Sequence, residues 1–287
     1  MSDERVREQT FDVDGPQDIE VVITAGAVDL LLTDEPGVTV RLRHRPDAAP
    51  PWAEGLAQLM NLFSSGTSGE SAIDQTRIEQ SDSRVVVRTP DWMRNVPLGV
   101  TVRAPSGSNV DVRSGSGDVL VTGAAGRLSV RTGSGEVKVD RADGAATVVT
   151  GTGAVRLGPM LGGLQARTGS GDVEVSSVGG TSAALITGSG DVWLGAVATD
   201  VTARTGTGDL TVADAATGKI ELKTGSGEIR VGVRQGTRAE VDLVSDSGQA
   251  RSELSLRDSP PSDGDVALRV RGRTRSGSAV VSAAFDG

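Results

Sequence analysis

The stretch Arg167-Thr-Gly-Ser-Gly-Asp-Val-Glu-Val175 decides how this chain folds. Its Gly-Ser-Gly centre recurs seven times with serine or threonine in the middle, and successive first glycines are 18, 18, 18, 19, 18 and 19 residues apart. These first glycines are Gly115, Gly133, Gly151, Gly169, Gly188, Gly206 and Gly225. A period this regular indicates one short structural unit stacked on itself.

Apolar residues alternate on both sides of each glycine turn. In one unit, Leu128 and Val130 precede the glycines, and Val137 and Val139 follow them. Period two predicts a strand with one buried face on each side of the turn. The glycines give the backbone freedom for a sharp change of direction. The same four inward positions hold only Val, Leu, Ile or Ala in all seven units, so we expect a narrow aliphatic core.

Two architectures fit this period. In an antiparallel meander each turn would be a hairpin, but the Asn-Gly and Asp-Gly pairs that hairpins favour are absent at these turns. Stacked coils, in contrast, require the same residues at every turn. We therefore predict an all-β, right-handed parallel β-helix (β-solenoid) with 18–19-residue coils, the hand following from the crossover rule. A left-handed triangular helix also has 18 residues per coil, but the pattern here is not hexapeptide.

Degenerate units flank the regular ones, and we expect one continuous domain with three parts. Residues 1–105 would hold N-terminal degenerate coils with a helical capping insertion at about 50–80. Residues 106–235 would form the regular solenoid, and residues 236–287 the C-terminal degenerate coils. The inward spacing also appears at Val28 and Leu30, beside Gly26, and at Val241 and Leu243 before Ser247-Gly248.

The insertion carries a helical stripe at i, i+4, i+7, i+8 and i+11. Its members are Trp52, Leu56, Leu59, Met60 and Phe63. We expect this helix to cover an open end or side of the solenoid, because a bare coil edge invites strand addition. The alternative is a docking helix for a partner or a membrane surface. Residues 64–71 are expected to form a loop.

Composition excludes several classes of function. The net charge of −9 disfavours a general affinity for nucleic acid or anionic membrane. The chain has no cysteine, and its one histidine is His44, so a catalytic triad and a histidine-based zinc site are excluded. We expect no metal and no cofactor. No apolar stretch approaches the roughly 20 residues of a transmembrane helix, and residues 1–9 do not resemble a signal peptide, so we expect a cytoplasmic location.

Stacking turns each repeat position into a column of side chains, and two columns are charged. The carboxylate column is Asp118, Glu136, Asp172, Asp191, Asp209 and Glu228. The basic column, five residues earlier, is Arg113, Arg131, Arg167, Arg204 and Lys223. Unpaired like charges about 4.8 Å apart would repel one another. We therefore expect acids and bases to neutralise each other in a surface ladder, which is the weak candidate binding surface of this chain.

Other interpretations of these columns are weaker. Calcium requires six to eight oxygens, which the acid spacing does not clearly supply. Two rows of Ser and Thr resemble an ice-binding face, but a glycine turn separates them, and hydrogen bonding to the turn explains them better. No helix and no lysine-serine pair follow the glycines, so a phosphate loop is excluded. Paired carboxylates for sugar cleavage stay possible, although a sugar cleft usually offers more aromatic side chains than Trp193.

The repeated Arg-Thr-Gly-Ser-Gly-Asp-Val-x-Val, present at 167–175 and almost unchanged at 131–139, resembles the bacterial β-strand-repeat domains of unknown function labelled "putative adhesin". The resemblance covers Val110 to Val231 well and the flanks weakly. It implies a β-solenoid and a role at the cell envelope, and it carries over no catalytic residue.

We therefore expect a non-enzymatic interaction or scaffold module, adhesin-like, that binds a protein partner or associates with itself. The alternatives are a secreted or surface adhesin, which places the protein at the cell surface, and an enzyme acting on carbohydrate. We expect no nucleic acid partner and no direct membrane insertion, and the sequence does not reveal a small-molecule ligand.

Overall fold

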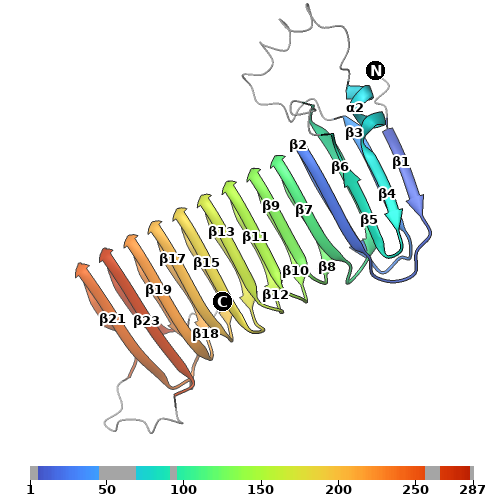
Figure 1. Cartoon of the computed structure of the whole chain (residues 1–287). Coiled ribbons are helices and arrows are strands. Elements are labelled where there is room, and N and C mark those ends of the chain that lie inside the picture. The colour runs from blue at the N-terminus through green and yellow to red at the C-terminus, as the bar shows by residue number, and fades with distance from the viewer. Residues whose placement is uncertain (1–5, 45–68, 91–95, 256–265, 285–287) are drawn as a thin grey trace, which may run out of the picture. The chain divides into compact units, whose positions relative to one another are not determined.

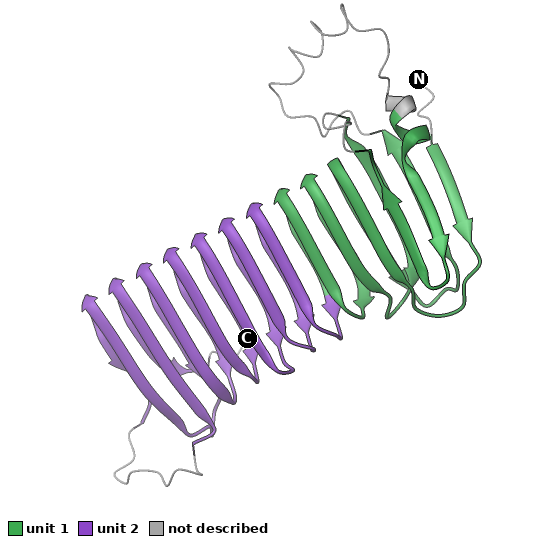
Figure 2. Cartoon of the chain, viewed as in Figure 1, with its two compact units in different colours: residues 1–140 green, residues 141–287 purple. Residues whose placement is uncertain are grey.

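The computed structural model of this chain describes residues 6–44, 69–90, 96–255 and 266–284 (Figure 1). The chain forms two compact units, residues 1–140 and residues 141–287, which are coloured separately in Figure 2. Both units are stacks of β-coils, as the repeat predicts.

Each coil of unit 2 has one strand before its glycine turn and one strand after it. The strands before the turn form a parallel sheet that we name the pre-turn sheet, and those after it form the post-turn sheet. The pre-turn strands are β11 (Ala146–Thr152), β13 (Leu164–Ser170), β15 (Ser182–Ser189), β17 (Asp200–Thr207), β19 (Gly218–Ser226), β21 (Ala239–Ser247) and β23 (Leu268–Ser276). The post-turn strands are β12 (Val155–Met160), β14 (Val173–Val178), β16 (Val192–Val197), β18 (Leu210–Ala215), β20 (Ile229–Val233), β22 (Ala250–Ser252) and β24 (Ala279–Ala283).

Equivalent residues of successive coils lie side by side in unit 2. Thr150 is in register with Thr168, and Thr168 with Thr187, in parallel pairing. The predicted stacking of 18–19-residue coils is therefore confirmed. The alternative, an antiparallel meander of hairpins, does not form here. The right-handed winding stays a prediction.

The predicted inward positions form the core. Within one coil, Val173 is 1% exposed and Val175 is fully buried, whereas the intervening Glu174 is exposed. The glycines are required for coils to stack closely. Gly208 has φ +136°, and a Cβ there would lie 2.1 Å from the carbonyl oxygen of Gly190 on the preceding coil. Any larger residue would push the two coils apart.

The coils at the end of unit 2 are out of sequence order. β23 pairs with β19 on one edge and with β21 on the other, so the later strand lies between two earlier ones (Figure 1). In the post-turn sheet, β24 likewise pairs with both β20 and β22. The coil that contains Val241 and Leu243 is therefore the last of the stack, although other coil residues follow it in the sequence.

Unit 1 combines parallel coils with antiparallel strands. Its strands are β1 (Val6–Phe11), β2 (Asp18–Thr33), β3 (Val38–His44), β4 (Arg77–Ser81), β5 (Arg84–Arg88), β6 (Leu98–Pro105), β7 (Asn109–Ser116), β8 (Val119–Ala125) and β9 (Leu128–Ser134). β10 (Val137–Ala142) begins in unit 1 and ends in unit 2. The first half of β2 pairs with β5 and β7, and its second half pairs with β6 and β8. β1 pairs with β3, β3 with β6, and β4 with β5, all antiparallel.

A short helix packs on unit 1. Helix α2 (Gly69–Gln75) contacts β1, β3 and β6, and its Ala72 and Ile73 are fully buried. Arg7 of β1 donates from Nη1 to the carbonyl oxygens of Ile73 (3.1 Å) and Thr76 (2.8 Å), which satisfies the end of the helix. The helix lies within the predicted insertion, but it begins at Gly69, inside the stretch expected to be a loop.

The helical stripe itself lies outside the described residues. The five side chains that were expected to cap the solenoid or dock a partner therefore stay a prediction; they are Trp52, Leu56, Leu59, Met60 and Phe63.

Candidate binding surface

Threonine hydroxyls in the glycine turns form hydrogen bonds with the backbone of their own turn and with that of the preceding coil. In unit 2, the Thr205 hydroxyl donates to the carbonyl oxygen of Thr207, two residues on, at 2.9 Å, and lies 3.1 Å from that of Gly190 on the preceding coil. Thr168 makes the same local bond to Ser170 at 3.1 Å. These threonines are buried, so the inner hydroxyl column stabilises the turn, as expected from local hydrogen bonding.

The carboxylate column has a structural role that the sequence did not reveal. In unit 2, Asp172 accepts the backbone N–H of Asp191 at 2.9 Å, Asp191 accepts that of Asp209 at 2.7 Å, and Asp209 accepts that of Glu228 at 2.7 Å. In unit 1, Asp118 accepts the N–H of Glu136 at 2.8 Å. Each aspartate thus holds the turn of the next coil through a charge-assisted hydrogen bond.

The expected neutralisation between the two charged columns is wrong for the aspartates. Among the described residues, no salt bridge joins Asp118, Asp172, Asp191 or Asp209 to the basic column. The two glutamates pair with other bases. Glu136 Oε2 lies 3.1 Å from Lys138 Nζ, and Glu228 Oε2 lies 2.5 Å from Arg230 Nη2. Residues i and i+2 of a strand share a face, so a base two residues after a glutamate is a closer partner than one five or more residues before it.

The basic column lies on the outward face of the pre-turn strands. In unit 1, Arg113 pairs with Asp111 at 2.9 Å, and Arg131 donates to the Ser129 hydroxyl at 3.3 Å. In unit 2, Arg167 is exposed beside Ile186 of the next strand. Arg204 and Lys223 are exposed and in register with each other. The candidate residues are therefore all at the surface, but acids and bases do not form one joint ladder.

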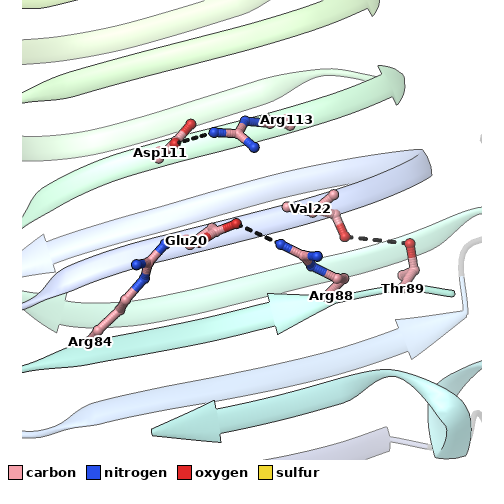
Figure 3. Close-up of polar contacts among 7 residues, drawn as sticks. All are labelled: Glu20, Val22, Arg84, Arg88, Thr89, Asp111 and Arg113. Carbon is pink, nitrogen blue, oxygen red and sulfur yellow. Dashed lines mark hydrogen bonds and ion pairs between the residues drawn. The ribbon is translucent and has the colours of Figure 1, made fainter. Parts of the chain in front are cut away.

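A buried ion pair lies at the outer face of unit 1 (Figure 3). Glu20 of β2 is 5% exposed, and it accepts hydrogen bonds from Arg84 and, at 2.9 Å, from Arg88 of the neighbouring strand β5. Burial raises the pKa of Glu20, but the hydrogen bonds and charges of Arg84 and Arg88 outweigh this, so its pKa is lowered from 4.5. Two shallow hollows flank the pair, and Arg84 lines both.

Sequence reasoning missed this cluster. Alternation with Ile19 and Val21 predicts an outward Glu20, and no sequence signal shows that β5 lies beside β2. Because both arginines are committed to one carboxylate, the cluster is a structural ion pair rather than a free anion site.

Groups suited to metal chemistry or membrane crossing are not apparent in the part of the chain that the structure describes. There, no three or more His, Asp or Glu residues gather as a metal site would require. Within the same residues, no helix has the length and apolar character needed to span a membrane.

Comparisons with known proteins found solved structures similar to this chain. A crystal structure of a "putative adhesin" from Bacteroides fragilis NCTC 9343 is 11% identical, with a TM-score of 0.43, covering 96% of this chain and 97% of that chain. One from Parabacteroides distasonis ATCC 8503 is 11% identical, with a TM-score of 0.34, covering 97% and 98%. A "putative lipid binding protein" from that organism is 8% identical, with a TM-score of 0.30, covering 98% and 95%.

No curated protein matches the chain. The Toastrack DUF4097 family, in contrast, matches residues 97–286, which include every regular repeat and the out-of-order coils of unit 2. With more than half of its length matched, this chain belongs to the Toastrack DUF4097 family.

Proposed function

We propose that this protein is a non-enzymatic, adhesin-like interaction module, and that it associates with a second copy of itself through the last coil of unit 2. The observation that carries this proposal is the incomplete burial of that coil. Val241 and Leu243 occupy inward positions, yet both are only half-buried, and Val244 is 41% exposed. Covering an apolar coil end of this kind with another surface lowers the free energy of the system.

The backbone of β21 supports the same proposal. Within the described ranges, β23 is the strand paired with β21, and the other edge of β21 has no strand beside it. Leu268 donates to the carbonyl oxygen of Arg238 at 3.3 Å, so alternation directs the N–H and C=O groups of Val241 and Leu243 toward that open edge. An open edge with free donors and acceptors is the standard site for strand addition.

The charges of this edge do not oppose pairing with a second copy. Glu240 lies 3.2 Å from Arg269, and Asp242 lies 3.8 Å from Arg271, so the acidic side chains of β21 are matched within the unit. A two-fold antiparallel pairing of β21 with its copy would use each open edge once and would close as a dimer.

Light scattering across a concentration series tests this proposal. We expect concentration-dependent dimerisation of the full chain and its loss in Leu243→Lys, because the lysine reaches solvent only while the coil end is uncovered. Leu161→Lys is the matched control, since Leu161 is an exposed leucine of unit 2 (43%) outside β21. A monomer at every concentration, or equal weakening by both variants, would contradict the proposal.

The compartment is a separate proposal. We infer a cytoplasmic location, with the cell surface as the alternative. Protease added to intact cells should leave the protein uncut if it is cytoplasmic, and should degrade it before the cytoplasmic marker if it is a surface adhesin.

A further inference from the structure

Three cations of the pre-turn sheet form an uninterrupted row in unit 2. Arg204 on β17 is in register with Lys223 on β19, and Lys223 is in register with Arg273 on β23. All three side chains are exposed. We name these residues the cation row. Neighbouring members are about 4.8 Å apart along the stack, as adjacent strands are.

The sequence does not predict this row in full. It shows Arg204 and Lys223 one repeat apart, but Arg273 enters the row because β23 inserts beside β19 and ahead of β21. The expectation that the carboxylate column neutralises these bases is wrong for its aspartates. Pairing with those aspartates therefore does not account for the positive charge of the row.

Three neighbouring charges on the same strands are matched, whereas the cation row and the exposed Arg275 of β23 are not. Lys219 pairs with Glu221, Arg269 with Glu240, and Arg271 with Asp242. Among the residues that the structure describes, no salt bridge includes a member of the cation row. Glu221 is nearby, and its pKa is lowered mainly by the hydrogen bond from Lys219 and in small part by the charge of Arg204.

Three adjacent like charges repel one another, and they do so in a protein of net charge −9. A bound anion would relieve this repulsion, and it would have to offer several charges in a line to meet all three. Two residues beyond Arg204 and Lys223 lie Gly206 and Gly225, which place no side chain over the sheet, whereas the equivalent residue beyond Arg273 is the exposed Arg275. Past them lies a row of exposed hydroxyls, formed by Thr207, Ser226 and Ser276 in register.

We propose that the cation row binds a linear anionic polysaccharide, whose carboxylate or sulfate groups meet Arg204, Lys223 and Arg273 while sugar hydroxyls meet the row of Ser and Thr. This proposal goes beyond the self-association described above and does not use the open edge of β21. The cations supply the affinity, and the hydroxyls supply hydrogen bonds that a simple salt would not use.

The surroundings of the row favour a thin single chain over other polyanions. Asp209 and Glu228 follow Arg204 and Lys223 by five residues on the same coils, so a DNA duplex or a flat anionic membrane would also meet these acids. Single-stranded nucleic acid binds largely by stacking on aromatic side chains, and aromatics are 2% of this chain.

Binding of the full chain to heparin and alginate, with neutral dextran as a blank, tests the proposal at several salt concentrations. The test variant is Arg204→Gln/Lys223→Gln/Arg273→Gln. The control is Arg156→Gln/Arg230→Gln/Arg234→Gln, which removes three cations of unit 2 that pair with Glu174, Glu228 and Asp214. Both variants change the net charge equally. Circular dichroism verifies the fold, and light scattering shows whether self-association is unchanged.

We expect the test variant to bind heparin and alginate about tenfold more weakly, a loss of about 1.4 kcal/mol of binding free energy. The control should stay within about twofold, because Arg156, Arg230 and Arg234 already pair with acidic side chains of the protein. Arg204→Lys/Arg273→Lys should keep most of the binding because the charges remain. If the triple variant fails to fold, Lys223→Glu alone should show the same direction of change.

Several results would overturn the proposal: no binding to either polysaccharide at low salt, equal weakening of test and control variants, or insensitivity to salt. Tighter binding to a single-stranded oligonucleotide or to phosphatidylglycerol vesicles than to the polysaccharides would also overturn it and would reassign the row to that class of ligand. Lost glycan binding with unchanged self-association would show that the two proposals concern different surfaces.

Discussion

The beginning of unit 1 and the end of unit 2 finish their cores in different ways. In unit 1, helix α2 packs on β1, β3 and β6 and places Ala72 and Ile73 where water does not reach them. In unit 2, the last coil leaves Val241 and Leu243 half-buried. In this chain, the repeat-like coil at the end of unit 2 leaves its own core partly open. Closure needs a segment that departs from the repeat, and unit 1 has one.

Placing a charge in the two cores would test this comparison most severely. Val173→Asp buries an unpaired carboxylate between coils, and we expect it to lower the free energy of unfolding by about 3–5 kcal/mol. At protein concentrations low enough to keep the chain monomeric, Val241→Asp should cost about 1 kcal/mol or less, because the side chain then reaches water at the open coil. Urea denaturation measures both. Similar losses would mean that the last coil is covered in solution.

An ion pair in unit 1 should likewise contribute more to stability than one at the end of unit 2. Glu20 in unit 1 has a side chain 6% exposed between two arginines, whereas Glu240 in unit 2 is 57% exposed beside Arg269. We expect Glu20→Gln to cost about 1–3 kcal/mol of stability and Glu240→Gln at most about 0.5 kcal/mol. Thermal unfolding at neutral pH would compare them, and a larger effect at Glu240 would refute the assignment of Glu20 as the buried partner.

The effect of Glu20 should depend on pH with a defined sign. Its pKa in the folded protein is lowered from the ordinary value of 4.5, so its stabilisation is present above that value. The stabilisation is lost as the pH falls through the folded pKa. The difference in stability between the wild type and Glu20→Gln should therefore shrink below pH 4.5. A difference that grows on acidification would contradict this.

The smallest contrast concerns the carboxylate column. Asp172→Ala removes the acceptor of the Asp191 N–H and should cost about 1 kcal/mol. The last coil has Gln249 at the equivalent position, directly after Gly248, and Gln249→Ala should change stability by less than about 0.5 kcal/mol. A loss of several kcal/mol in Asp172→Ala would indicate a bound ion or a buried network.

Local features of the fold could be predicted from the sequence because they depend on neighbouring residues. The alternation at Val173 and Val175 and the glycines of each turn identify strands, inward faces and coil length. The order of coils could not be predicted, because the inward Val270 of β23 and Val241 of β21 are equivalent in character and either could lie next to β19. Strand choice at the ends depends on the path of the connecting segments.

The charged columns illustrate the same limit. Side-chain pairing was expected between Asp172 and Arg167 because both are charged, yet the partner of Asp172 is a backbone N–H on the next coil, which every residue type offers. Arg113 was also expected to pair with the carboxylate column, yet its partner is Asp111, two residues away on the same strand face. The ion pairs of Glu20 could not be predicted either, because its two arginines come from a strand whose position the repeat does not specify.

The position of β23 has a consequence for the order in which the chain can fold. β2 is synthesised before the strands that flank it and can serve as their template, but β23 is synthesised after both β19 and β21. Until β23 has been synthesised, β21 lacks the strand with which it pairs in the described structure. The coils of unit 2 therefore cannot all be added in the order in which they are synthesised, because β21 can pair with β23 only after that later strand has been made.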